Sequence, residues 1–183
     1  MADLKSNPMD SARLFQALEE AAKATFETIA TSFQRQVRVG SGEIQDPAQI
    51  FKQIVDGEHG QVHICAKVDF VGDVTGQVIL RCNAQGALDI SRGLLMLEEG
   101  EAIQIDEVED ALAECANIIG GLMKTKALDP HGTYRLGLPE IFRLPHDSEG
   151  THGGSLLYQI KQGIISVEIW RLDGVDGSSR AAA

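Results

Sequence analysis

An acid and an amide, Glu114 and Asn117, stand three residues apart in a stretch that reads as one long helix, residues 106–126. At about 100° per residue, side chains three apart point the same way from a helix. The pair therefore presents a negative charge and a neutral hydrogen-bonding group to whatever approaches that side. Asn is a poor residue for a helix interior, because its amide competes for backbone groups. Its position favours a task beyond helix formation.

The same helix shows two stripes about 150° apart. The apolar stripe, which we expect to pack, consists of Val108, Leu112, Cys115, Ile119 and Leu122. The polar stripe consists of Asp110, Glu114, Asn117 and Gly121. Two consecutive glycines, Gly120 and Gly121, each cost about 1 kcal/mol in mid-helix relative to Ala. They indicate close approach to the backbone, either by a partner or by another part of the chain. A merely solvated polar face is the alternative interpretation.

The first half of the chain predicts one long helix, a short strand and a hairpin. Residues 10–33 are predicted to form the helix, with Asp10-Ser11 at its start. The apolar residues that recur at helical spacing are Leu14, Leu18, Ala22, Phe26, Ile29 and Phe33. A short strand is expected over residues 36–44. Alternating apolar residues over 62–70, a turn at Gly72-Asp73 and a second run over 74–82 predict the hairpin.

A shorter helix is expected at residues 88–97. The second half then repeats the order of the first: the long helix at residues 106–126, an extended segment and a hairpin. Residues 134–142 read as an extended segment made irregular by Pro139, and residues 146–154 as a polar loop. Residues 156–161 and 164–171 form a second hairpin. We therefore expect an α+β fold, two long helices packed on an antiparallel sheet of about six strands. The repeated order is either a pseudo-twofold duplication or coincidence.

Composition narrows the class of protein. The 183 residues are 43% hydrophobic and carry 27 acids against 16 bases, a formal charge of −11. This acidity disfavours binding to nucleic acid or to a membrane surface, and no run approaches the roughly 18 apolar residues of a membrane helix. We expect one domain over residues 10–172, with disordered ends at 1–9 and 173–183.

The cysteines and the first residues of the chain indicate a cytoplasmic protein. Cys65, Cys82 and Cys115 lie far apart, which fits buried thiols in a reducing compartment. The first residues of the chain are polar and do not resemble a targeting segment. The histidines lack metal-ligand spacing with each other or with cysteine, so no metal or cofactor of its own is expected.

The long helix resembles the signature helix of the CheC/CheX-type chemotaxis phosphatases. The resemblance rests on Asp110-x3-Glu114-x2-Asn117 and on the Gly-Gly and Lys124-Thr125 that follow. Residues 70–80 resemble the strand pair of that family, and Leu138-Pro139 resembles its leucine-proline step. The element order matches as well, so the resemblance covers about residues 10–172.

The first helix lacks the acid–amide pair. Aligned on the second, it places Ala24 and Glu27 where Glu114 and Asn117 stand. One motif helix instead of two resembles the CheX branch of the family.

The resemblance implies a hydrolase that removes the aspartyl phosphate of a CheY-like response regulator. Asn117 would hold the attacking water, and Glu114 would pair with the active-site lysine of the receiver domain. Mg²⁺ would belong to that receiver. The residues expected to contribute to docking are Asp110, Gly120, Gly121 and Lys124.

The family also implies a homodimer that joins sheet edges, for which the hairpins at residues 62–82 and 156–171 are the candidates. Two alternatives stay open. One is a non-catalytic docking module related to flagellar switch proteins, which resemble this architecture and bind the regulator without hydrolysing its phosphate. The other is an unrelated α+β protein with a solvated polar stripe.

Overall fold

The structure, a computed structural model, describes residues 11–30, 34–39, 63–128, 133–143 and 150–172. Its helices are α1 (Ser11–Ile29), α3 (Ala84–Leu95) and α4 (Ile105–Met123), and α4 continues into a π-helical turn, η1 (Lys124–Leu128). Its strands are β1 (Gln34–Val39), β2 (Ile64–Val71), β3 (Gly76–Cys82), β4 (Arg135–Leu136), β5 (Glu140–Arg143), β6 (Thr151–Ile160) and β7 (Gly163–Arg171).

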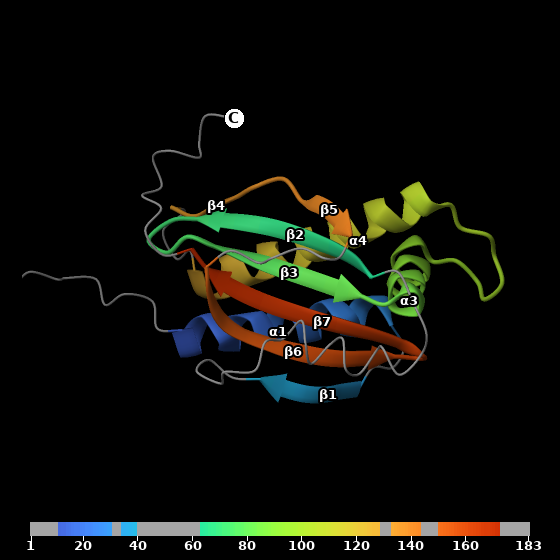
Figure 1. Ribbon diagram of the computed structural model, residues 1–183, viewed down its shortest axis with the longest axis horizontal. Coiled ribbons are helices and arrows are strands. Elements are labelled where there is room, and N and C mark those ends of the chain that lie inside the picture. The colour runs from blue at the N-terminus through green and yellow to red at the C-terminus, as the bar shows by residue number, and fades with distance from the viewer. Residues whose placement is uncertain (1–10, 31–33, 40–62, 129–132, 144–149, 173–183) are drawn as a thin grey trace, which may run out of the picture.

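The strands form one antiparallel sheet in the order β1-β6-β7-β3-β2, and β4 and β5 both pair with the remaining side of β2. The sheet is therefore six strands wide. Figure 1 shows α1, α3 and α4 together on one face of it. The predicted α+β class, two long helices on an antiparallel sheet of about six strands, is confirmed, with α3 as the shorter third helix.

The sheet order is symmetric, which supports the duplication interpretation. Counted from the β1 edge, the order is edge strand, hairpin β6–β7, hairpin β3–β2, edge strand β5. Each half of the chain supplies a long helix, an edge strand and a hairpin. The edge strand of each half pairs with the hairpin of the other half, β1 with β6 and β5 with β2.

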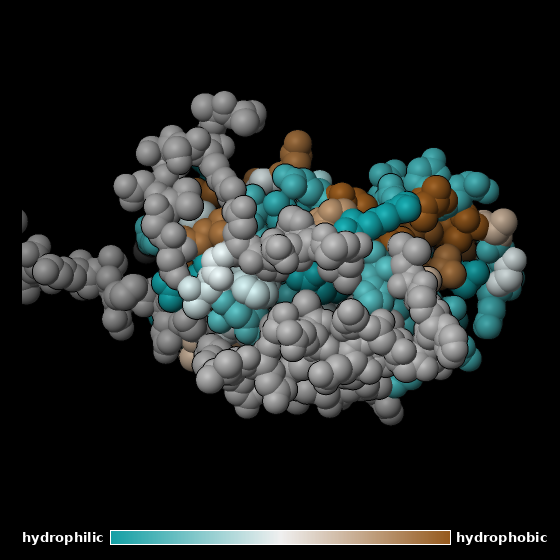
Figure 2. All heavy atoms as spheres, in the orientation of Figure 1, coloured by the Kyte–Doolittle hydropathy of each residue, from teal (hydrophilic) through white to brown (hydrophobic). Residues whose placement is uncertain are grey.

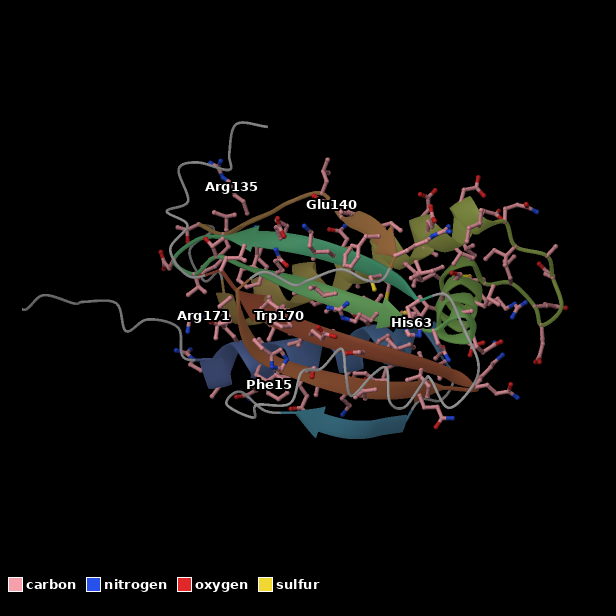
Figure 3. All side chains as sticks on the ribbon, in the orientation of Figure 1. Phe15, His63, Arg135, Glu140, Trp170 and Arg171 are labelled. Atoms are coloured by element: carbon pink, nitrogen blue, oxygen red, sulfur yellow. The ribbon has the colours of Figure 1, made fainter. Side chains whose placement is uncertain are left out.

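The two hairpins are interior, which corrects their assignment as candidate sheet edges. β2 is flanked by β3 and by β4–β5, and β6 is flanked by β7 and β1. The outer strands are β1 on one side and β4–β5 on the other. Figure 3 shows Arg135 and Glu140 along this second edge, beside the connection between β4 and β5.

The core lies between the sheet and the helices. Four of the five predicted apolar residues of α4 are buried, and Leu122 is partly buried against the same cluster. In α1, Leu14, Leu18 and Phe26 are buried as the periodicity predicts. Phe33 lies outside the described residues. Because apolar residues at helical spacing supply the buried faces of both helices, burial rather than propensity sets their orientation.

The helix boundaries differ from the predicted ones: α1 ends at Ile29 and α3 at Leu95, before the predicted residues 33 and 97. Helix α3 begins at Ala84 because Asn83 caps it: its Oδ1 accepts hydrogen bonds from the backbone N–H of Gly86 (2.7 Å) and of Ile164 (3.0 Å). Helix α4 keeps α-helical geometry only to Met123, and the π-helical turn completes the predicted segment.

Strand β6 begins at Thr151, within the segment predicted to be a polar loop. Its ladder with β7 is irregular between His152 and Gly154. Gly154 has a φ of +147°, and a side-chain carbon there would overlap the ring of Phe15 on α1. The strand therefore continues through two glycines because the helix packs directly against its backbone.

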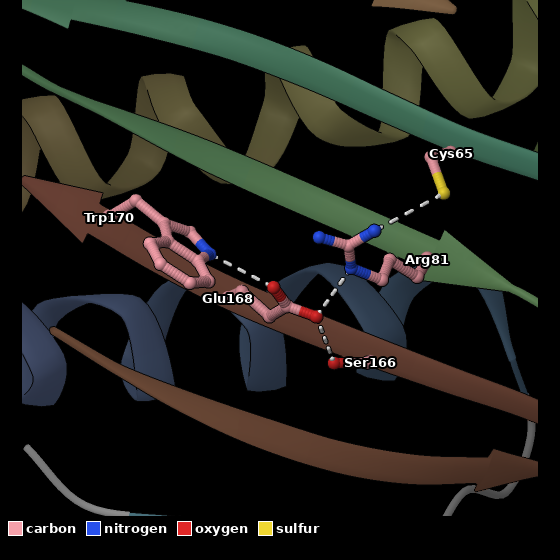
Figure 4. A network of polar contacts seen from close by, with 5 residues as sticks. All are labelled: Cys65, Arg81, Ser166, Glu168 and Trp170. Carbon is pink, nitrogen blue, oxygen red and sulfur yellow. Dashed lines mark hydrogen bonds and ion pairs between the residues drawn. The ribbon is translucent and has the colours of Figure 1, made fainter. Parts of the chain in front are cut away.

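The face of the sheet opposite the helices carries a buried ion pair (Figure 4). Nε of Arg81 donates to Oε1 of Glu168 at 2.7 Å, and the two side chains are 1% and 0% exposed. The same carboxylate accepts hydrogen bonds from Oγ of Ser166 (3.1 Å) and from Nε1 of Trp170 (2.9 Å). Every oxygen of this buried carboxylate is thus paired, which burial of a charge requires.

The predicted disordered ends and most of residues 36–62 lie outside the described residues. In the part of the chain that the structure describes, no helix is long and apolar enough to cross a membrane.

Candidate functional site

The polar stripe of α4 lies on the outward side of the helix. Asp110 and Glu114 are exposed and Asn117 is half-buried. Among the described residues, no hydrogen bond or ion pair joins the side chain of Glu114 or Asn117 to another residue. At a spacing of three, their Cβ atoms lie about 5–6 Å apart on one face. The acid and the amide can therefore contact one external group together.

Both ends of α4 are held by specific contacts. At its start, the backbone N–H of Gln104 donates to Oε2 of Glu107 at 2.8 Å, half of a capping box. One turn later, Arg143 of β5 bridges to Glu109 (3.1 Å) and ties the helix to the sheet edge. At its end, Oγ1 of Thr125 donates to the carbonyl of Gly121 at 2.9 Å. The two end contacts are local to the helix, whereas the Arg143 bridge and the buried side of α4 hold it against the sheet.

The two mid-helix glycines have different environments. Gly120 is buried, and a Cβ there would lie 2.9 Å from Cγ1 of Val68 and 3.8 Å from Leu136. Its missing side chain lets α4 approach β2 and β4 of the same chain. A Cβ on Gly121 would meet no atom within 4 Å. We therefore remove Gly120 from the candidate docking residues and retain Gly121.

This difference predicts opposite effects of the same substitution. Gly121→Ala should raise the free energy of unfolding by up to about 1 kcal/mol, because Ala is the better helix former and the space is open. Gly120→Ala gains the same propensity but must displace Val68, an overpacking cost of about 1–3 kcal/mol. In urea denaturation, the midpoint of Gly120→Ala should be clearly lower than that of Gly121→Ala. Equal midpoints would contradict the packing role of Gly120.

The end of the stripe has a geometry that helical periodicity did not predict. Lys124 is half-buried and begins the π-helical turn, and its backbone N–H donates to the carbonyls of Gly120 and Gly121. A π-helical turn places one extra residue in the turn and shifts the direction of the residues that follow. The apolar pattern of α4 does not mark this turn, because η1 follows Met123, the last buried residue of α4.

Cys115 offers no nucleophile to the site. It lies on the packed side of α4 and is fully buried. Burial, with a smaller effect from the charge of Glu114, raises the pKa of its thiol to about 12. All three cysteines are free and buried, as predicted. In the described residues, no group of three or more His, Cys, Asp or Glu side chains could hold a metal ion.

The profile of the family "Chemotaxis phosphatase CheX" matches residues 64–146, which include the whole of α4. This segment matches the CheX family. The resemblance to the CheC/CheX-type proteins is thereby confirmed. None of the curated proteins compared with the sequence matches it.

Solved structures show that the CheX-like fold extends beyond the matched segment. The CheX protein of Borrelia burgdorferi, solved in a complex with CheY, BeF3 and Mg²⁺, is 15% identical (TM-score 0.63, 90% of this chain and 99% of that one). A CheC-like protein of Shewanella oneidensis is also 15% identical (TM-score 0.64, 88% and 99%). FliY of Thermotoga maritima is 12% identical (TM-score 0.57, 94% and 93%). At these identities the likeness establishes the shared fold.

Proposed function

We propose that this CheX-like chain hydrolyses the aspartyl phosphate of a CheY-like response regulator. The observation that carries the proposal is that Glu114 and Asn117 lie side by side on an exposed helix face within a CheX-like fold. The Borrelia CheX protein was solved with CheY, BeF3 and Mg²⁺, which identifies a receiver domain as the class of partner to test.

Asn117 is assigned the positioning of the attacking water. Phosphoryl transfer asks little covalent chemistry of the protein and depends on alignment and charge stabilisation. A carboxamide can accept one hydrogen bond from a water and donate another without adding negative charge beside the phosphoryl group. GTPases use a glutamine in the same way. Asn117 is half-buried on the outward side of α4, beside the exposed Glu114, so its amide can face the active site of a docked receiver.

Glu114 is assigned the pairing with the active-site lysine of the receiver. It lies one turn before Asn117 on the same side, so an ion pair there would fix the helix in register with the phosphate. A pair that loses water on docking contributes orientation and specificity. Gly121, with open space around it, lets the loops of the receiver approach the backbone. Asp110 and Lys124 flank this region as docking charges, and Mg²⁺ is supplied by the receiver.

The test is the lifetime of phosphate on a purified CheY-type receiver from the same organism, with Mg²⁺, with and without this protein. Faster decay at substoichiometric protein supports the proposal. Binding to the BeF3-activated receiver with an unchanged phosphate lifetime would favour the docking-module alternative. No binding to any receiver of the organism would remove the proposed activity and leave the fold assignment standing.

A homodimer joined through sheet edges remains part of the proposal. In this fold such a dimer would use β1 or the β4–β5 edge, because both hairpins are interior. Exposed backbone groups at a sheet edge are ready to pair with another strand. The proposed activity belongs in the cytoplasm, with the response regulator.

A further inference from the structure

A second exposed surface lies where α3 ends and α4 begins. Leu95 is 44% exposed, Met96 91% and Ile105 56%, and we call these three residues the corner patch. Figure 2 shows hydrophobic side chains gathered over this end of the molecule. Contiguous apolar surface on a soluble protein marks an interaction site more often than single exposed residues do.

Met96 is held in a conformation that its residue type disfavours. It follows the last residue of α3 with φ +55° and ψ +36°, the left-handed position in which helices usually carry Gly or Asn. The backbone N–H of Leu97 donates to the carbonyl of Arg92 (3.0 Å), which closes the helix end in the usual manner. A glycine could adopt this left-handed conformation at the end of α3 without strain. The chain instead places a large, flexible apolar side chain there, almost fully in solvent.

Acids outnumber bases around the corner patch, where the bases are Arg92 in the last turn of α3 and Lys161. Residues 95–107 contain five acids, Glu98, Glu99, Glu101, Asp106 and Glu107, and no Lys or Arg. All five are exposed. Lys161, on the β6–β7 turn, approaches Glu99 only to 3.9 Å, and both side chains are largely exposed. A surface of this kind repels anionic lipid and nucleic acid and attracts positive charge.

The corner patch faces away from the proposed phosphatase face. Ile105 lies about 140° around α4 from Asp110 at 100° per residue. A partner seated on the patch would therefore leave Glu114 and Asn117 accessible.

We propose that the corner patch docks a basic amphipathic segment of another protein, with apolar anchors on Met96 and its neighbours and Lys or Arg side chains against the surrounding acids. Apolar anchors seated on a patch and framed by opposite charge are a recurring mode of helix recognition. Charge argues against a second copy of this chain, because two-fold packing of the patch would bring the same five acids together. Met suits such a surface because its side chain adapts to different apolar partners.

The test uses a fluorescent 18-residue peptide of Leu and Lys with one apolar and one basic helical face, titrated with the full-length protein. A scrambled peptide of the same composition and a peptide with Glu in place of Lys are the controls. We expect saturable anisotropy for the amphipathic basic peptide alone, weakening with added salt. Met96→Gly and Ile105→Ser should each weaken binding about tenfold or more. Leu138→Ser, which alters an 88% exposed leucine elsewhere, should leave it unchanged.

Met96→Gly separates docking from folding, because glycine relieves the left-handed strain and should keep or raise the unfolding midpoint while binding is lost. The proposal is overturned if the scrambled peptide binds equally well, if Met96→Gly and Leu138→Ser bind alike, or if no peptide saturates. Sedimentation of the native protein tests whether a second copy of this chain binds the patch instead. Self-association that Met96→Gly abolishes would assign the patch to a second copy.

Discussion

Replacing Asn117 with Ala should abolish the acceleration of receiver dephosphorylation, a loss of about 10²-fold or more in kcat. The expected size follows from removing a preorganised group that acts only on the reacting water. The receiver should still bind, because Glu114 and the rest of the stripe remain. Stopped-flow or radiolabel measurement of phosphate loss at saturating receiver, with binding to the BeF3-activated receiver measured separately, checks both statements.

Two further variants and a stability control sharpen this result. Asn117→Asp keeps the shape but places a negative charge beside the phosphoryl group, so it should be as inactive as Ala. Glu114→Gln should weaken binding more than it lowers kcat at saturation. The midpoint temperature of thermal unfolding should be unchanged or slightly higher in Asn117→Ala, since Ala is the better helix former. Retention of more than half the native kcat by Asn117→Ala would remove the amide from the mechanism.

Replacing Glu168 with Ala should destabilise the fold by about 3–5 kcal/mol, because it leaves the guanidinium of Arg81 buried without its counter-ion. Natural domains have only about 5–15 kcal/mol of total stability, so this variant should be close to unfolding at 37 °C. Urea denaturation followed by far-UV circular dichroism measures the loss. Trp170, the only tryptophan of the chain, donates to this carboxylate, so its fluorescence should report the local change as well.

A double substitution distinguishes loss of charge balance from loss of packing. Arg81→Met combined with Glu168→Leu removes both charges while keeping apolar volume, and should recover most of the stability lost in Glu168→Ala. Glu168→Gln keeps two of the hydrogen bonds at most. Its free energy of unfolding should lie between those of Glu168→Ala and the double variant. A Glu168→Ala variant within 1 kcal/mol of the native protein would show that the pair is solvated in solution.

The sequence predicted the elements around the site because each carries apolar residues at regular spacing on the face that meets the core. Leu112 and Ile119 on α4, and Val78 and Leu80 on β3, repeat at the periods of helix and strand, and the core lies where those periods place it. The same reasoning could not foresee the pair of Arg81 and Glu168. Alternation along a strand separates two faces, but it does not say whether the polar face meets water.

Local backbone conformation was equally hard to predict. Nothing in the apolar pattern distinguishes Gly120, which admits Val68, from Gly121, which meets open space. The left-handed Met96 breaks the rule that such positions prefer glycine. The acid–amide pair itself was visible in the sequence, because three-residue spacing on a helix needs no tertiary information. Its assigned chemistry remains a prediction for the receiver experiments.

The exchange of edge strands has a consequence for how this chain reaches its native state. Strand β1 near the start pairs Gln34 with Gln159 near the end, and β5 reaches back to β2. Neither half can complete its own sheet, so a chain emerging from the ribosome must wait for its last hairpin before its first strand is paired. Contacts so distant in sequence slow folding. Cutting the chain between the halves should yield two fragments that are unstable apart and can assemble only with each other.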